Sequence, residues 1–278
     1  MTAQVAASVA EESKATDHAK AGKKGGRIDY IDGIRAVAAL AVVFLHAFQM
    51  RGYDLAHVLT LPPDLVPSDT TLGTVLALLY DIGGNLGLYA VKVFIVISGY
   101  TLMLGAAKSA DGMPKGGLKG YFQRRIRRIW PPYYAALGLS LAIIFLLPGM
   151  NTEFGGYLDQ HIPVTWDGVA AHLFFLQNLT PHWSFQINMP LWTIAVEEQI
   201  YIIFPFLLLP LWRRYPSFVL VAAAVIVPLA GALLLPYVNF LEIRPWFLIL
   251  FGFGAWGASI SFSKRTQDVR WRERIPWV

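Results

Sequence analysis

Two polar side chains interrupt the first long apolar segment of the chain, residues 28–50, and limit how it can fold. Arg35 lies near its start and His46 lies well inside it. They are eleven positions apart, so on one helix both side chains share a face, about 16 Å apart along the axis. Because a charge at mid-bilayer costs about 2.5–3.5 kcal/mol, this face is predicted to line a bundle interior or a water-filled cavity.

A structural explanation of the same residues remains open. Arg35 could extend its side chain to the membrane interface, and His46 could make one hydrogen bond to a neighbouring helix. The rest of the sequence favours a functional role, because it also places carboxylates inside apolar segments.

The composition is too apolar for an ordinary soluble domain. The 278 residues are 55% hydrophobic and 15% charged, with a mean hydropathy of +0.48. The absence of cysteine excludes disulfides, thiolate metal sites and cysteine-bound intermediates. The net charge of +5 does not indicate nucleic-acid binding, because the basic residues lie in short stretches between apolar segments.

Six apolar segments are predicted as membrane spans, at residues 31–50, 86–107, 133–147, 191–212, 217–235 and 246–262. Basic clusters follow the second, fourth and sixth of them. The largest cluster is the arginine run 124–128, predicted as a cytoplasmic loop that ends at Pro131-Pro132. We therefore expect an all-α, polytopic transmembrane helical bundle of about six spans with a cytoplasmic N-terminus.

The remaining segments complete the predicted organisation. Residues 1–26 are expected to be a disordered cytoplasmic tail, 27–262 the transmembrane domain, and 263–278 a basic cytoplasmic tail or a truncated loop. A polar connection is expected at 51–71 and a short, half-buried apolar segment at 72–80. Residues 149–188 should form an outer loop, with one interfacial helix at 167–179 capped by Asp167.

The fourth span carries two neighbouring carboxylates. Glu197 is expected about 9 Å below the outer boundary and His46 about 13 Å below it, so the two side chains could meet. A carboxylate there would fix the imidazole tautomer and stabilise its protonated form, as in a catalytic base. Glu197 could instead make only a structural hydrogen bond. Glu198 points about 100° away around the helix and is predicted to be structural.

For other polar residues, the sequence indicates a functional role less strongly. Arg125 and Arg128 could clamp a phosphate group beside the membrane, or could serve topology alone. Ser98, next to Gly99, is predicted to make a close helix contact rather than to act as a nucleophile. No metal site is predicted, because the three histidines of the outer loop lie too far apart: His161, His172 and His182.

Four motifs follow one another along the chain. They are Asp32-Gly33-x-Arg35 followed after ten residues by His46, FIVISGY at 94–100, Arg125-x-x-Arg128-x-x-Pro131, and Trp192-x-x-x-x-Glu197-x-x-x-Tyr201-x-x-x-Pro205. In this order they resemble the acyltransferase-3 family of integral-membrane O-acyltransferases. Arg244, just before the sixth span, also resembles a later segment of that family. The resemblance covers residues 28–260.

The resemblance implies transfer of an acyl group, expected to be acetyl, from cytoplasmic acyl-CoA to a hydroxyl of a sugar or surface glycan. It implies essential roles for Arg35 and His46, donor binding by Arg125 and Arg128, and catalytic support by Glu197. Further supporting residues would be Ser98, Tyr100, Trp192 and Tyr201. Acyl-CoA would be a co-substrate, with no bound cofactor, and the multi-pass protein would reside in the bilayer of the cell membrane.

Some positions depart from the family pattern. Lys92 stands where many members have an acidic or neutral residue, Ile95 replaces a frequent phenylalanine, and Thr193-Ile194 replaces the usual Ser-Leu. The family usually has more spans, so the chain resembles its N-terminal six. A non-catalytic transporter or a lipid- or glycan-binding scaffold remains the alternative, because such proteins also bury polar residues on facing helices.

Overall fold

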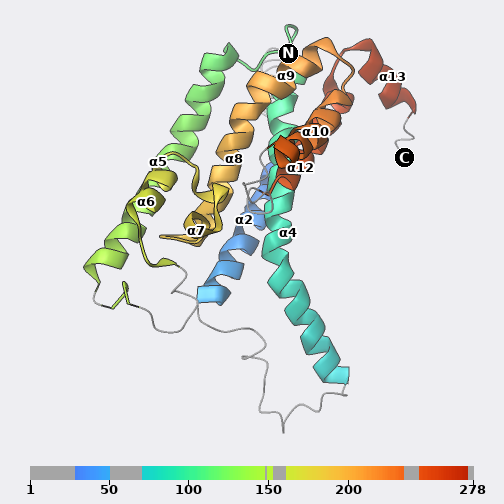
Figure 1. Cartoon of the computed structure of the whole chain (residues 1–278). Helices are drawn as coiled ribbons and strands as arrows, with labels where there is room; N and C mark the ends of the chain where they lie inside the picture. The colour runs from blue at the N-terminus through green and yellow to red at the C-terminus, as the bar shows by residue number, and fades with distance from the viewer. Residues whose placement is uncertain (1–28, 51–70, 148, 153–160, 235–243, 275–278) are drawn as a thin grey trace, which may run out of the picture. The chain divides into compact units, whose positions relative to one another are not determined.

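The computed structural model describes residues 29–50, 71–147, 149–152, 161–234 and 244–274 (Figure 1). Every regular element within these residues is a helix, which confirms the all-α class. The chain divides into two units, Met1–Val37 and Ala38–Val278. The predicted tail at 1–26 and most of the predicted connection at 51–71 lie outside the described residues.

Helix α2 (Asp29–Met50) covers the first predicted span. Helix α4 (Thr71–Ala107) is one helix of 37 residues, so the separate short segment predicted at 72–80 is wrong. The Asp81-Ile82-Gly83-Gly84 sequence does not end this helix, because a glycine costs only about 1 kcal/mol relative to alanine and no proline interrupts α4.

Helix α12 (Trp246–Phe262), which has the bounds predicted for the sixth span, packs along α4. Two glycines permit the close approach of their backbones. A Cβ atom on Gly99 would collide with the carbonyl group of Phe251, and one on Gly254 would collide with the carbonyl group of Val96. The prediction that Gly99 marks a close helix contact is therefore confirmed.

Helix α5 (Gly117–Leu146) contains the arginine run, so the loop predicted there is wrong. Pro131 and Pro132 lie inside this helix, although each lacks an amide donor. Tertiary contacts hold the helix on both sides of the prolines. The Tyr121 hydroxyl donates to the carbonyl oxygen of Tyr201 at 2.9 Å, and the Tyr133 hydroxyl donates to that of His172 at 2.7 Å.

The fourth predicted span is a continuous run of helical elements. It consists of η3 (Met189–Leu191), α8 (Trp192–Ile203), η4 (Phe204–Leu208) and α9 (Leu209–Arg214). Element η4 is a π-helical turn that contains Pro205, a residue that commonly disturbs the α-helical ladder. The fifth predicted span corresponds to α10 (Val219–Leu234).

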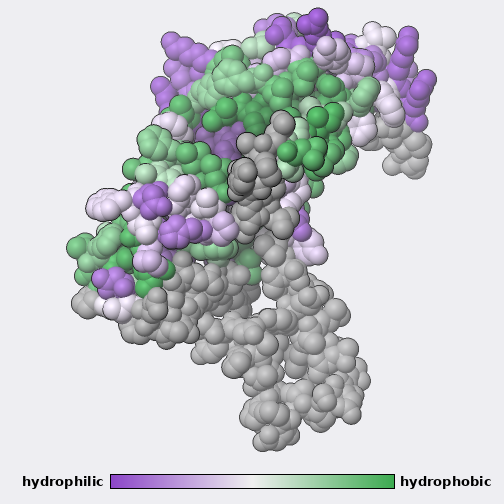
Figure 2. Space-filling model, viewed as in Figure 1, coloured by the Kyte–Doolittle hydropathy of each residue, from purple (hydrophilic) through white to green (hydrophobic). Residues whose placement is uncertain are grey.

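Three described helices are long and apolar enough to cross a membrane: Tyr89–Ala107, Gly117–Leu146 and Met189–Arg214. A fourth results if α12 and α13 (Thr266–Arg274), which meet at 92°, form one broken span. The predicted number of six spans is not confirmed. Figure 2 shows a hydrophobic surface over these helices and hydrophilic residues gathered where α5 begins and α13 lies.

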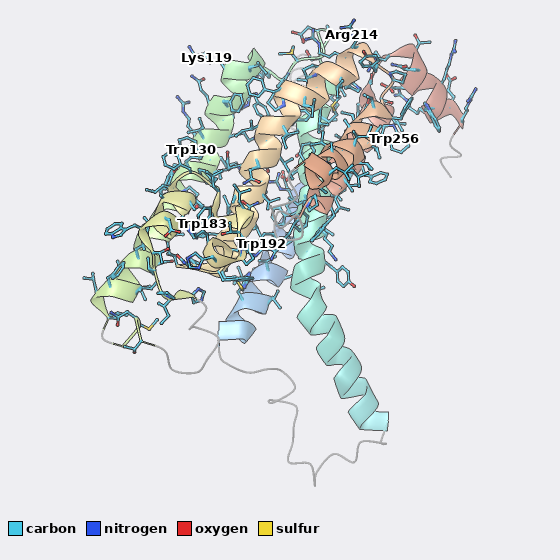
Figure 3. The ribbon with its side chains drawn as sticks, viewed as in Figure 1. Lys119, Trp130, Trp183, Trp192, Arg214 and Trp256 are labelled. Atoms are coloured by element: carbon cyan, nitrogen blue, oxygen red, sulfur yellow. The ribbon has the colours of Figure 1, made fainter. Side chains whose placement is uncertain are left out.

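The predicted outer loop contains short helices rather than one interfacial helix. These are α6 (Trp166–Leu173), η2 (Gln177–Leu179) and α7 (Pro181–Ser184). Thr165, not Asp167, caps α6 by accepting a hydrogen bond from the Gly168 amide at 3.2 Å. Asp167 accepts one from the indole of Trp183 at 2.7 Å (Figure 3). Side-chain hydrogen bonds from Thr165 and from Trp183 to the Asp167 carboxylate lower the pKa of this group, because they stabilise its charged form.

Buried polar side chains join this outer segment, residues 161–191, to two long helices. Gln177 donates to the Tyr133 hydroxyl of α5 at 3.1 Å and to the Leu191 carbonyl at 3.0 Å. Asn178 and Gln199 of α8 exchange two amide hydrogen bonds, at 3.1 and 2.7 Å. Since a buried polar group that loses its partner is costly, this network fixes the outer segment against α5 and α8.

Candidate active site

His46 lines a cavity of about 120 Å³. Helix α2 supplies His46, α5 supplies Ser140, and the outer segment supplies His161 and Asn188. His46 is half-buried. The polar position in the first apolar segment therefore faces a cavity, as the sequence predicts.

The polar side chains of this cavity are held by hydrogen bonds to their neighbours. Asn188 donates to Ser140 Oγ at 2.8 Å, which fixes the side of the cavity formed by α5. His161 Nδ1 lies 3.3 Å from the carbonyl oxygen of Phe185, so in the neutral ring Nδ1 carries the hydrogen and Nε2 the lone pair.

Burial lowers the pKa of the His161 imidazole, and the Phe185 carbonyl partly offsets this effect. The ring is therefore mostly neutral at pH 7. His161 was predicted to be a polar group of the outer loop, and its place in the same cavity as His46 was not predicted. No motif or spacing indicates it, because the two histidines are far apart in sequence.

Several predicted site residues form a second cluster between α4, α5 and α8. The Tyr201 hydroxyl lies 3.0 Å from Glu197 Oε2 and 3.3 Å from Ser98 Oγ. The guanidinium of Arg125 lies over the Tyr201 ring, 5.3 Å from its centroid. The structure thus brings together four predicted residues from three motifs.

The interactions of Glu197 and His46 differ. The Glu197 carboxylate accepts a hydrogen bond from Tyr201 on the next turn of α8, and His46 faces the cavity shared with the outer segment. Direct pairing of His46 with Glu197 stays a prediction. Glu198, predicted to be structural, is buried next to the Trp130 indole and near Arg125.

Arg125 and Arg128 have different surroundings on α5. Arg125 is half-buried against Tyr201, whereas Arg128 is exposed. Their spacing of three residues places them on neighbouring positions of one helix face. Arg35 is half-buried in the first unit, Met1–Val37, whereas the other predicted site residues lie in the second unit.

The two remaining supporting residues make aromatic contacts. Tyr100 meets Phe262 edge-on, with ring centroids 6.3 Å apart. Trp192 stacks on Phe247 at 5.8 Å, and the Arg244 guanidinium lies 3.4 Å from the centroid of the Trp192 ring. Arg244 is thus a cation–π partner of a predicted site residue.

A family model described as an acyltransferase domain, Acyl_transf_3, matches residues 28–277. A Staphylococcus aureus (strain COL) protein named as a candidate O-acetyltransferase is 28% identical over 206 residues, which cover 69% of this chain and 27% of that protein. The peptidoglycan O-acetyltransferase OatA of Listeria monocytogenes is 26% identical over 195 residues, which cover 68% of this chain and 26% of OatA.

The chain thus matches about a quarter of the length of these relatives. No solved structure is significantly similar to it. The family model, in contrast, covers nearly all of the chain and includes every residue of the cavity and of the second cluster. The chain therefore belongs to the acyltransferase-3 family.

Proposed function

We propose that the chain is the membrane-embedded acyltransferase part of an enzyme that transfers an acetyl group from acyl-CoA to a hydroxyl of a cell-envelope glycan. Family membership supports acyl transfer, and the names of the relatives support O-acetylation of a glycan. The observation that carries the proposal is the cavity lined by His46, within the part of the chain that matches the family.

His46 is the general base in this proposal. It accepts the proton of the acceptor hydroxyl while the hydroxyl oxygen attacks the thioester carbonyl carbon. The carbon–sulfur bond then breaks, and the proton passes to the departing CoA thiolate. A positioned base of this kind contributes about 10²–10⁴ in rate.

The size of the cavity supports a short acyl group. Its volume is about 120 Å³. An apolar cavity of roughly 150 Å³ holds a molecule the size of benzene. An acetyl group and the attacked hydroxyl fit within such a space, whereas a long acyl chain does not.

The donor would approach from the end of the bundle where α5 begins. Lys119 of α5 and Arg214 of α9 both lie at that end (Figure 3). The positive-inside rule supports a cytoplasmic location for it, and cytoplasm is where acyl-CoA occurs. Arg128 is exposed on α5 and can bind a CoA phosphate through its planar guanidinium. Arg35 would assist Arg128 in binding the donor. The proposal also includes six membrane spans, with both termini on the cytoplasmic side.

The acceptor would approach from the opposite side, beside the outer segment. Asn188, Ser140 and His161 supply donors and acceptors that can hold a sugar hydroxyl next to His46. The proposal can be tested with membranes that contain the protein, labelled acetyl-CoA and a cell-envelope glycan fraction. Label should appear in the glycan. If no label is transferred while labelled acetyl-CoA still binds, the non-catalytic scaffold becomes the better explanation.

A further inference from the structure

Helix α13 is anchored at nearly a right angle to α12, with a bend of 92°. Its anchor is a chain of buried hydrogen bonds. The Trp212 indole donates to Ser259 Oγ at 2.7 Å, and the Ser259 hydroxyl donates to Asp268 Oδ2 at 2.9 Å. Asp268 is fully buried, so the position of α13 depends on this contact.

A second set of hydrogen bonds holds the same helix. Arg272 donates to the carbonyl oxygens of Ser261 and Ser263, at 3.0 and 2.8 Å, near the end of α12. Arg265, just before α13, donates to the carbonyl oxygens of Trp212 and Tyr215. These two arginines therefore stabilise the bend between the helices.

An aromatic row continues from α12 onto α13. Phe253 and Trp256 of α12 lie with ring centroids 6.5 Å apart, and Trp271 of α13 meets Trp256 edge-on at 6.2 Å. Phe253 is 48% exposed and Trp271 is 45% exposed, so the row continues along the outer surface of the apolar helix α12. Tryptophan at the end of a span is typical of the membrane–water interface.

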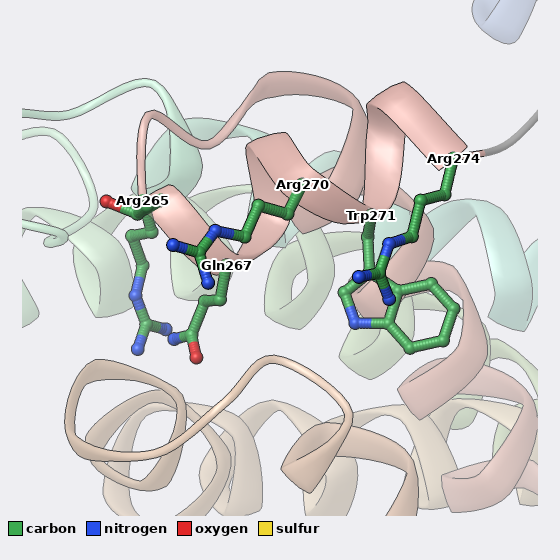
Figure 4. Close-up of a pocket in the computed structure, with 6 residues that line it drawn as sticks. Arg265, Gln267, Arg270, Trp271 and Arg274 are labelled. Carbon is green, nitrogen blue, oxygen red and sulfur yellow. The ribbon is translucent and has the colours of Figure 1, made fainter.

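A basic pocket lies along the same helix. It has a volume of about 490 Å³ and is lined by Arg265, Thr266, Gln267, Arg270, Trp271 and Arg274 (Figure 4). Among the described residues, no carboxylate lines it. Arg270 and Arg274 are exposed, and among the described residues they make no hydrogen bond or ion pair. Their guanidinium groups are thus available for an anion, beside the exposed ring of Trp271.

We propose that this pocket, the α13 pocket, binds the phosphate of an anionic phospholipid headgroup. A helix perpendicular to a span lies in the plane of the interface, at the depth of the headgroups. Guanidinium groups suit phosphate because they can donate two parallel hydrogen bonds. Basic residues beside an anionic leaflet each strengthen lipid binding about fivefold. The site is separate from the His46 cavity and does not depend on the proposed acyl transfer.

The test measures lipid bound to the purified full chain by native mass spectrometry, with phosphatidylglycerol or phosphatidylcholine added to the detergent. The Arg270→Gln/Arg274→Gln variant should bind at least tenfold less phosphatidylglycerol than the wild type, with no change for phosphatidylcholine. Lys115→Gln/Lys119→Gln removes the same charge from exposed sites elsewhere and should leave binding unchanged. Arg270→Lys/Arg274→Lys should bind phosphatidylglycerol at a level between these two variants, because the charge remains but the two parallel hydrogen bonds are lost.

Thermal unfolding of each variant shows whether the fold is preserved. An equal loss of phosphatidylglycerol binding in Arg270→Gln/Arg274→Gln and in the control Lys115→Gln/Lys119→Gln would overturn the proposal, because net charge alone would then explain binding. Displacement of phosphatidylglycerol by millimolar inorganic phosphate would also overturn it, since the pocket would then be a site for soluble anions. Unchanged phosphatidylglycerol binding in the folded arginine variant would have the same consequence.

Discussion

Tyr201 donates its hydroxyl hydrogen to Glu197 Oε2 at 3.0 Å, one turn apart on α8. The same hydroxyl lies 3.3 Å from Ser98 Oγ of α4, so a phenol with one hydrogen can donate to the carboxylate and accept from the serine. This arrangement orients the Glu197 carboxylate and connects it to a neighbouring helix. Tyr201 thereby becomes a positioning residue for the proposed site.

Tyr201→Phe should lower both stability and acetyl transfer. The substitution leaves Glu197 and Ser98 without the hydroxyl, at a cost of about 1–3 kcal/mol for buried polar groups. Chemical denaturation and transfer assays measure the two effects. Tyr134→Phe is the matched control, because its hydroxyl donates to the Leu173 carbonyl at 2.8 Å outside this cluster. Equal effects of the two substitutions on transfer would contradict a role for Tyr201 in positioning Glu197.

The stability of the protein should fall as pH decreases below about 6.5, the ordinary pKa of histidine. Burial lowers the pKa of His172, so the unfolded chain binds a proton in this range more readily than the folded chain. His172 Nδ1 bonds to the Gly168 carbonyl at 2.8 Å, and Nε2 is buried without a hydrogen-bond partner among the described residues. A protonated ring would therefore be a buried charge, which the backbone groups of Gly168 and Gln186 stabilise only in part.

His172→Asn should weaken this pH dependence, because an asparagine amide can replace the Nδ1 donor but cannot be protonated. Thermal unfolding between pH 7.5 and 5.5 provides the measurement. His161 contributes in the same direction, so some dependence should remain. If the variant and the wild type lose stability in parallel over this range, His172 does not cause the effect.

Substitutions of Arg125 and Arg128 on α5 should have different effects on acetyl-CoA binding and on transfer. Arg128→Lys should weaken acetyl-CoA binding, because a lysine ammonium cannot reproduce two parallel hydrogen bonds to phosphate. Arg125→Lys should also reduce transfer by disturbing the contact with Tyr201. Isothermal titration with acetyl-CoA distinguishes the two. Arg127→Lys, also exposed on α5, is the control. Unchanged affinity in the Arg125→Lys/Arg128→Lys double variant would leave topology as the only role of the pair.

His161 should affect the reaction through the cavity that it shares with His46. His161→Asn keeps a donor for the Phe185 carbonyl but removes the second imidazole. We expect a higher KM for the glycan and a changed acid limb of the pH–rate profile, because Nε2 can contact the acceptor hydroxyl. His182→Asn is the control, since His182 is exposed. Identical KM values and pH profiles for the two variants would remove His161 from the site.

Local patterns in the sequence predict part of this structure well. The bounds of α12 and of the helical run 189–214 follow from continuous apolar stretches, whose helical state depends little on distant residues. The prediction of a loop around Arg125 was wrong, because it was based on the basic cluster and on the Pro131-Pro132 pair, neither of which ends α5. Tertiary hydrogen bonds outweigh the cost of the proline in the folded chain.

The composition of the site was harder to predict. Ser98, Arg125, Glu197 and Tyr201 were identified from their motifs, and the structure joins them in one cluster. The second imidazole of the cavity was not found, because His161 reaches it through the fold of the outer segment. Contacts such as that between Asn178 and Gln199 leave no periodic pattern in the sequence.

Substitutions of Glu197 and Arg35 should affect different steps of the proposed reaction. Glu197→Gln should reduce transfer less than loss of His46, because it keeps the shape and a hydrogen bond to Tyr201 while removing the charge. Arg35→Ala should act mainly on donor affinity, since Arg35 is predicted to lie about 16 Å from His46 along α2. Both variants should be measured together with His46→Ala, in assays of acetyl transfer and of acetyl-CoA binding.

The rate of acetyl transfer by His46→Ala in membranes shows whether His46 is the general base. The variant should still insert and bind acetyl-CoA, because the lost side chain faces a cavity rather than lipid. Transfer to the glycan should fall by about 10²–10⁴, as expected for a lost general base. A His46→Ala protein that transfers acetyl groups at the wild-type rate would contradict this account of the active site.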